Sequence, residues 1–173
     1  MKYTARIIRK RLGFTLIELL VVFSVITIMS SVGFASFVSY SNRQIVVQAV
    51  AHLEQTINLA RFNASSSVKP ASCGIDELSA YRVNFCHTLG VCSSPTADYE
   101  MTVVCGGSES IQEARNLPDN VNMQDVSGGS GDCRTLTFRI LSGIAEGTPC
   151  EIDLAGYNNT VRLSIDDLGH ANY

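Results

Sequence analysis

The sequence predicts an α+β protein in which one long N-terminal helix precedes a domain of short antiparallel strands. Residues 14–63 contain no proline and no helix-stopping cluster. After Pro70, apolar and polar residues alternate in short runs that are typical of strands. No helical pattern separates these runs, so we expect an antiparallel sheet whose apolar face is covered by the second half of the helix.

Charge is distributed unevenly along the 173 residues, a length suited to one domain of moderate size. Residues 1–12 contain five basic and no acidic side chains, whereas the remainder has 8 basic and 16 acidic residues. Because phosphate binding needs clustered lysine and arginine, we do not expect the acidic body to bind nucleic acid.

The segment from Leu19 to Asn42 contains no charged residue. It is long enough to cross the hydrocarbon core of a membrane, which takes about 20 helical residues. We therefore predict a transmembrane segment over about residues 14–42, with the basic N-terminus in the cytoplasm. The alternative is a cleaved secretory signal peptide, but its apolar core would be only about 7 to 15 residues long.

Glu18 lies at the start of this apolar run, where a carboxylate costs a few kcal/mol unless it meets a partner. The residues around it read Leu12-Gly13-Phe14-Thr15-Leu16-Ile17-Glu18-Leu19-Leu20. With the basic residues before it, this motif resembles the class III signal of type IV prepilins and type II secretion pseudopilins.

The resemblance implies how the N-terminus is processed. Residues 1–13 would be a leader that a membrane prepilin peptidase removes between Gly13 and Phe14, and the new Phe14 amine would be N-methylated. Glu18 would then serve assembly, because its counterpart in the family is thought to meet the Phe14 amine of a neighbouring subunit. The implied fold is a pilin-like ladle, a long helix packed on an antiparallel sheet.

The second half of the helix, residues 43–63, is amphipathic. Val46, Val50, Leu53, Ile57 and Ala60 recur at steps of four and three, which places them on one stripe. Residues 65–70, which read SSSVKP, predict the helix end. We expect the first half of the helix to pack with other subunits and this stripe to pack on the head.

The head, residues 64–173, contains five or six predicted strands and a hairpin turn over residues 156–159. The alternating runs are Tyr81-Val83-Phe85, Tyr99-Met101-Val103, Val121-Met123, Leu136-Phe138-Ile140, Ile152-Leu154 and Val161-Leu163-Ile165. The serine and glycine residues of 127–131 predict an exposed loop.

Within the pilin superfamily, the head is similar to those of H-type minor pseudopilins and T-type minor pilins. The residues that carry this similarity are Leu59-Ala60-Arg61, Leu117-Pro118-Asp119-Asn120-Val121, Leu136-Thr137-Phe138 with Gly143, and Val161-Arg162-Leu163-Ser164-Ile165 with Gly169. Some T-type relatives bind DNA through a C-terminal stretch rich in arginine, but residues 169–173 of this chain contain none.

All six cysteines lie in the second half of the chain and none forms a CxxC pair. They are Cys73, Cys86, Cys92, Cys105, Cys133 and Cys150. An even number in one region predicts structural disulfides formed outside the reducing cytoplasm, rather than a metal site. Six cysteines allow 15 connectivities. We favour a Cys133–Cys150 bridge because these residues flank a predicted strand.

No catalytic motif accompanies the three histidines, and we predict neither an enzyme nor a cofactor. His87 follows Cys86, but adjacent residues on a strand point to opposite faces. The oxygens of Asp153, Asn158, Asn159, Asp166 and Asp167 could gather around Ca²⁺, yet they lack EF-hand spacing and are better explained as a solvated acidic edge.

The sequence thus predicts a minor pilin or pseudopilin, a structural subunit of a type IV pilus or type II secretion pseudopilus that acts in assembly initiation or at the tip. The alternative is a pilus-borne binding subunit for DNA uptake or adhesion. The expected partners are the prepilin peptidase, other pilin subunits and the inner-membrane assembly platform. We expect a single-pass inner-membrane protein with a periplasmic or extracellular head, which then enters the filament.

Overall fold

The computed structural model describes residues 14–86, 92–94, 96–124 and 133–173. The chain divides into two compact units, Met1–Tyr40 and Ser41–Tyr173, and each is described by itself. The expected leader and the loop predicted over residues 127–131 lie outside the described residues.

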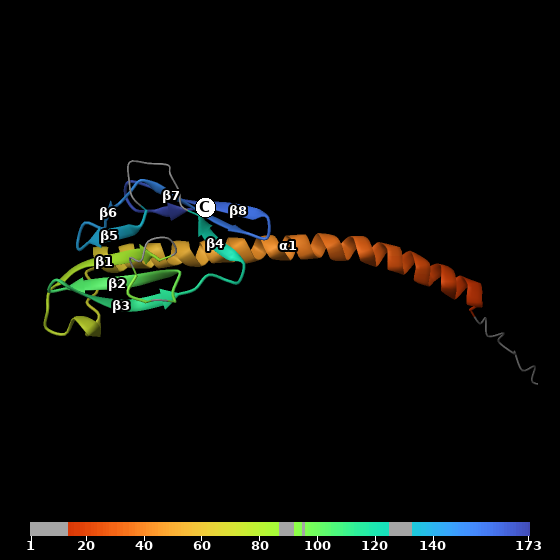
Figure 1. Ribbon diagram of the computed structural model, residues 1–173, viewed down its shortest axis with the longest axis horizontal. Helices are drawn as coiled ribbons and strands as arrows, with labels where there is room; N and C mark the ends of the chain where they lie inside the picture. The colour runs from red at the N-terminus through yellow and green to blue at the C-terminus, as the bar shows by residue number, and fades with distance from the viewer. Residues whose placement is uncertain (1–13, 87–91, 95, 125–132) are drawn as a thin grey trace, which may run out of the picture. The chain divides into compact units, whose positions relative to one another are not determined.

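The helix α1 spans Leu16–Ser65 and ends where the sequence predicts a stop (Figure 1). Ser67 has a positive φ of 51° and its N–H donates to Ala64 O at 3.1 Å. The N–H of Val68 donates to Asn63 O at 2.9 Å. This pair of bonds is the Schellman pattern, which satisfies carbonyls that the last helical turn leaves free.

Within the described residues, nine strands and a short 3-10 helix follow α1, and every strand pairing is antiparallel. They are η1 (Ala71–Cys73), β1 (Leu78–Phe85), β2 (Tyr99–Cys105), β3 (Ser108–Arg115), β4 (Val121–Gln124), β5 (Thr135–Arg139), β6 (Ala145–Glu146), β7 (Cys150–Gly156), β8 (Asn159–Ile165) and β9 (Ala171–Asn172). The α+β class predicted from the sequence is confirmed.

The strands form two sheets rather than the one that the sequence suggests. Their orders are β3-β2-β1-β5-β6 and β4-β7-β8-β9. The hairpin predicted between the last two apolar runs is confirmed as the β7–β8 turn, in which Gly156 pairs with Asn159. Tyr157 and Asn158 both have positive φ, 52° and 60°, as a two-residue type I′ turn requires.

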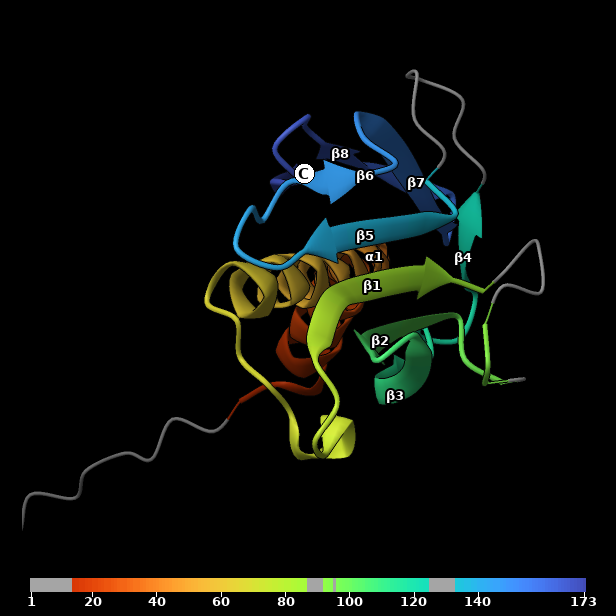
Figure 2. The same cartoon turned by 90° about the vertical axis from the view of Figure 1, so that its left-hand side faces the viewer.

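Strands of both sheets surround the second half of α1 (Figure 2). The core of this second unit forms around the predicted stripe of the helix. Val46, Val50, Leu53, Ile57 and Ala60 are all fully buried. They belong to one cluster with apolar side chains of both sheets, including Phe138 of β5 and Leu163 of β8. The stripe therefore joins the two sheets to the helix.

Three disulfides link the six cysteines: Cys73–Cys105, Cys86–Cys92 and Cys133–Cys150. The third is the pair favoured from the sequence. Cys133 precedes β5 of one sheet and Cys150 begins β7 of the other, so this bridge connects the two sheets. Closing a loop of this size stabilises a fold by about 3 kcal/mol in the loop-entropy account.

The transmembrane segment expected over residues 14–42 is not supported. Among the residues that the structure describes, no helix has both the length and the apolar character needed to cross a membrane.

Gly169 occupies a crowded turn between β8 and β9. Its φ is +76°, and a Cβ added there would lie 2.7 Å from Phe138 Cε1 and 2.8 Å from Ala145 Cβ. Gly107 has a similar φ of +86°, but a Cβ added at Gly107 would have no neighbour within 4 Å among the described residues. The two glycines therefore separate the effect of backbone conformation from that of crowding.

We predict that Gly169→Ala lowers the free energy of unfolding by about 3 kcal/mol, from positive φ and overlap with buried Phe138 together. Gly107→Ala should lose about 1 kcal/mol, because only the positive φ opposes it. Urea unfolding of the full-length protein in detergent, followed by near-ultraviolet circular dichroism, measures both. Equal losses for the two variants would contradict the close packing at Gly169.

Candidate functional site

Thr15 caps the N-terminus of α1 and places Glu18 in its first turn. The N–H of Glu18 lies 3.3 Å from Thr15 Oγ1, and the N–H of Leu19 donates to Thr15 O at 3.2 Å. The spacing Thr-x-x-Glu is that of a capping box, and the contact from the Glu18 N–H to Thr15 is one half of it. The cap fixes where the helix begins and holds Glu18 beside its positive end.

The helix surface after this cap is apolar on every side. The five consecutive residues 19–23 are each between 49% and 60% exposed. Because successive helical residues are turned by about 100°, five in a row go around the whole helix. A helix that is apolar all around is normally covered by protein or lipid, so this segment requires a cover.

Two hydroxyl groups of the apolar segment form hydrogen bonds within the helix. Ser24 Oγ donates to Val21 O and Thr27 Oγ1 donates to Phe23 O, both at 2.8 Å. Such bonds to preceding carbonyls let these side chains enter an apolar environment without water. The sequence from Phe14 to Asn42 contains one charged side chain, that of Glu18.

The Glu18 carboxylate has no ion pair or hydrogen bond with any residue that the structure describes. If the apolar helix surface is covered, this carboxylate is removed from water with it. A charge buried in this way needs a cationic or hydrogen-bonding partner. That partner has to come from a part of the chain outside the described ranges or from another molecule.

Of the expected processing residues, Phe14 is described and is 81% exposed. Gly13 lies outside the described residues. The structure therefore describes the residues after the expected cleavage site and not the residues before it.

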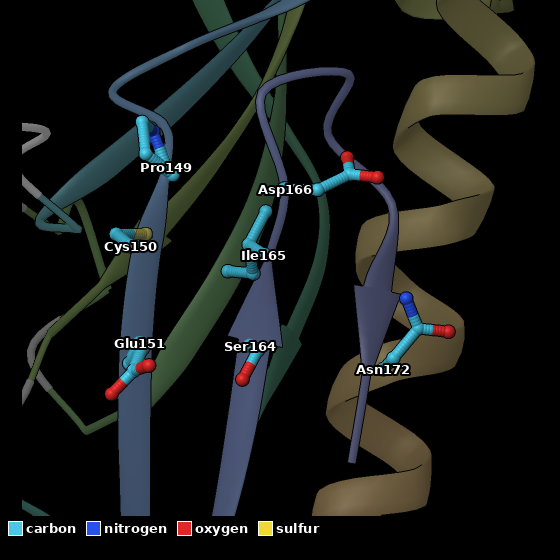
Figure 3. Close-up of a pocket in the computed structure, with 7 residues that line it drawn as sticks. All are labelled: Pro149, Cys150, Glu151, Ser164, Ile165, Asp166 and Asn172. Atoms are coloured by element: carbon cyan, nitrogen blue, oxygen red, sulfur yellow. The ribbon is translucent and has the colours of Figure 1, made fainter. Parts of the chain in front are cut away.

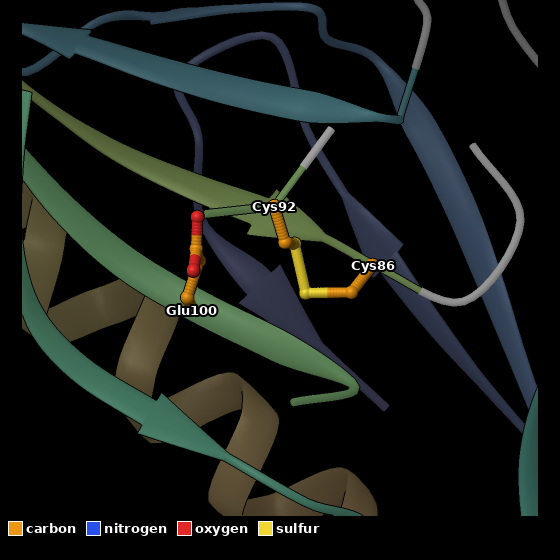
Figure 4. Close-up of side chains that lie close together, drawn as sticks. All are labelled: Cys86, Cys92 and Glu100. Carbon is orange, nitrogen blue, oxygen red and sulfur yellow. A yellow bond between two sulfur atoms is a disulfide. The ribbon is translucent and has the colours of Figure 1, made fainter. Parts of the chain in front are cut away.

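Glu100 forms a second notable site, which the sequence analysis missed. It lies on β2, is fully buried, and is within 4.8 Å of the sulfurs of Cys86 and Cys92 (Figure 4). Glu100 Oε1 accepts from Asn84 Nδ2 at 3.2 Å and from Ser93 N at 3.0 Å. Oε2 accepts from Ser94 N at 3.1 Å. The carboxylate thereby anchors the chain on either side of the Cys86–Cys92 bridge.

A pocket of about 210 Å³ lies at the ends of β7, β8 and β9 (Figure 3). Its lining consists of Pro149, Cys150, Glu151, Ser164, Ile165, Asp166 and Asn172. Both acids already have partners, because Arg162 lies 2.8 Å from Glu151 and His170 Nδ1 lies 3.0 Å from Asp166. Both carboxylates that line this pocket therefore have partners among the described residues of the head.

The Asp166 carboxylate accepts hydrogen bonds from Leu168 and His170 of the loop that follows it. Burial alone would raise its pKa, but hydrogen bonds from the backbone N–H and ring of His170 outweigh burial and hold the pKa below its ordinary value. Asp153 is paired with Arg162, and the Asn159 side chain donates to Tyr157 O. The carboxylates of Asp153 and Asp166, two of the five residues considered for Ca²⁺, are thus engaged by separate neighbours.

Residues 8–34 match a family model described as the prokaryotic N-terminal methylation motif. The matched segment contains Gly13, Phe14 and Glu18. It supports a likeness to pilins and pseudopilins, but does not identify the H-type or T-type group. No curated protein and no solved structure matches the chain.

We predict that Glu100→Ala lowers the free energy of unfolding by about 2 kcal/mol, because buried Asn84 then lacks its acceptor. The matched control is Glu146→Ala, a strand glutamate whose side chain is 55% exposed and paired with Arg139. An exposed pair contributes less than about 1 kcal/mol. Urea unfolding compares the two; a smaller loss for Glu100→Ala than for the control would contradict the anchoring role.

Proposed function

We propose that this protein is a minor pilin or pseudopilin, a subunit that enters a type IV pilus or type II secretion pseudopilus through its N-terminal helix. The observation that carries the proposal is the capped helix that follows the Gly13-Phe14 junction. Up to Asn42 this helix has a single carboxylate, that of Glu18, and residues 19–23 expose apolar side chains on every side. Other subunits with the same kind of helix supply both the apolar cover and the cation.

Cleavage between Gly13 and Phe14 explains the source of the cation. It removes the five basic residues of the leader and creates an α-amine at Phe14, four positions before Glu18. In the proposed filament, the Phe14 amine of one subunit pairs with the Glu18 carboxylate of another. Attraction between the two charges is stronger among packed helices than in water, and it offsets the desolvation of both.

The disulfide-bonded head supports a location outside the cytoplasm, where such bonds persist. The prepilin is processed at the cytoplasmic membrane by the prepilin peptidase and engages the assembly platform there. We also propose that the subunit is of low abundance and acts in initiation or at the tip. The similarity of the head to H-type minor pseudopilins and T-type minor pilins supports this role and this grouping.

The arrangement of charges in the head argues against the nucleic-acid alternative. Four strand arginines form ion pairs with neighbouring acids: Arg82 with Glu109, Arg115 with Glu113, Arg139 with Glu146, and Arg162 with Glu151 and Asp153. An arginine neutralised in this way offers little net positive charge to a phosphate backbone. This pairing favours a structural subunit over a DNA receptor.

We predict that the mature protein begins at Phe14. Expression with a prepilin peptidase should yield an intact mass that lacks residues 1–13, increased by one methyl group where methylation occurs. Gly13→Ala should leave the leader in place, because the signal that this motif resembles has glycine itself before the cleaved bond. Expression without the peptidase is the control. A mature species that retains residues 1–13 in the presence of the peptidase would contradict the pilin proposal.

We also predict that Glu18 acts in assembly and not in folding. Glu18→Ala and Glu18→Gln should both reduce recovery in sheared filaments at least about tenfold, the effect of losing about 1.4 kcal/mol of pairing. Agreement between the two variants would assign the effect to charge and not to size. Leader cleavage and the circular dichroism of the head should stay unchanged.

The matched control is Glu54→Ala, since Glu54 is the other glutamate of α1 and lies in the second unit. This variant should enter filaments at the wild-type level. Normal incorporation of Glu18→Ala would mean that helix packing alone recruits the subunit.

A further inference from the structure

The pocket at the ends of β7, β8 and β9 combines apolar and polar lining residues (Figure 3). Pro149, Cys150 and Ile165 are its apolar residues, and the other four are polar or charged. Its volume of about 210 Å³ lies below the roughly 300–1,000 Å³ that is usual for drug-sized ligands. The pocket therefore has room for a ligand of about one ring with its substituents.

Three of the polar residues form a row across three neighbouring strands. Glu151 of β7 is the register partner of Ser164 of β8, and Ser164 is the partner of Asn172 of β9. Because register partners point to the same face of a sheet, the three side chains follow one another at the strand spacing of about 4.8 Å. Figure 3 shows Glu151 and Ser164 next to one another at the same level of the sheet. A ligand with several hydroxyl groups can contact more than one of these side chains at once.

Two members of the row have their whole hydrogen-bonding capacity free. Within the described part of the chain, no hydrogen bond involves the Ser164 hydroxyl or the side-chain amide of Asn172. A hydroxyl and an amide can each donate and accept. Ser164 and Asn172 can therefore bind a ligand that offers both donors and acceptors.

The two acids of the pocket are oriented by their own neighbours and can still accept. Glu151 Oε2 accepts from Arg162 Nη1 at 2.8 Å. Asp166 accepts three bonds, one from the N–H of Leu168 and two from the N–H and ring of His170. A carboxylate has about four acceptor positions, so each acid keeps at least one for a ligand beyond these bonds.

The charges at the pocket favour a neutral ligand. An anion would be repelled by the carboxylates of Glu151 and Asp166. A cation would have to compete with Arg162 for Glu151 and with His170 for Asp166. A neutral molecule with several hydroxyl groups meets neither obstacle. Sugar rings belong to this class, and their C–H faces are apolar enough to pack on a residue such as Pro149.

We propose that this pocket binds one neutral pyranose sugar, either free or at the end of a glycan. Hydroxyl groups of the sugar donate to Glu151 and Asp166 and exchange hydrogen bonds with Ser164 and Asn172, while one face of the ring packs on Pro149. The inference goes beyond the proposed filament role and does not depend on it.

Titration followed by nuclear magnetic resonance tests the site. Isotope-labelled full-length protein in dodecylphosphocholine, a detergent without a sugar group, is titrated with glucose, galactose, mannose and N-acetylglucosamine. We expect at least one of them to shift the amide signals of residues 150–151, 164–166 and 172, with a Kd of about 1 mM and one sugar per chain. The methyl glycoside of that sugar separates the two sources. Equal affinity indicates the end of a glycan, binding of the free sugar alone indicates a monosaccharide, and either result supports the site.

Two variants and a matched control assign the binding to the pocket. Ser164→Ala and Asn172→Ala should each weaken binding about threefold to tenfold, because each removes one hydrogen-bonding group. Asn122→Ala should bind as the wild type does, since Asn122 is an exposed asparagine of β4 in the same sheet and does not line the pocket. Circular dichroism should show the same folded head in all three variants.

Charged sugars test the class of ligand. Glucosamine, which has an ammonium group, and glucuronate, which has a carboxylate, should both bind more weakly than glucose does. Tighter binding of either one would overturn the assignment to neutral sugars. The site itself is overturned if none of the four neutral sugars shifts the pocket signals, or if Ser164→Ala and Asn172→Ala both bind with wild-type affinity.

Discussion

The uncovered apolar surface of the first half of α1 is the constraint on which this account of the protein depends. Residues 19–23 expose large apolar side chains around the whole helix, and Glu18 is the only charge between Phe14 and Asn42. Burying such a surface is worth about 25 cal/mol for each Å² removed from water, so association is strongly favoured. The single carboxylate then limits which associations are allowed, because a partner that buries it has to supply a cation or a hydrogen-bond donor.

The second half of the same helix packs in the core of the head. Its stripe from Val46 to Ala60 is fully buried in one cluster with side chains of both sheets, whereas Leu59 and Phe62 of the same half are exposed. The Cys133–Cys150 bridge links one sheet covalently to the other. The helix α1 thus exposes apolar side chains in its first half and supplies part of the core of the head in its second.

Short stretches of sequence predicted three parts of the fold. The spacing of apolar residues predicted the buried stripe of α1, the residues SSSVKP predicted the helix end near Ser65, and residues 156–159 predicted the β7–β8 turn. The strand β3 was not predicted, because its edge position leaves side chains on both faces exposed and no alternation results. Burial of Glu100 also has no local signal, since alternation along β2 assigns it to the polar face. Its carboxylate is held by the backbone beside the Cys86–Cys92 bridge, a tertiary contact.

The central claim is that other subunits cover the apolar helix, and photo-cross-linking at Val22 tests it most directly. Val22 is half exposed in the segment that needs a cover. A photoreactive amino acid placed there in assembling cells should form cross-links to the N-terminal helices of other pilin or pseudopilin subunits. Cross-links to lipid alone, with no protein partner under conditions in which filaments form, would contradict the account.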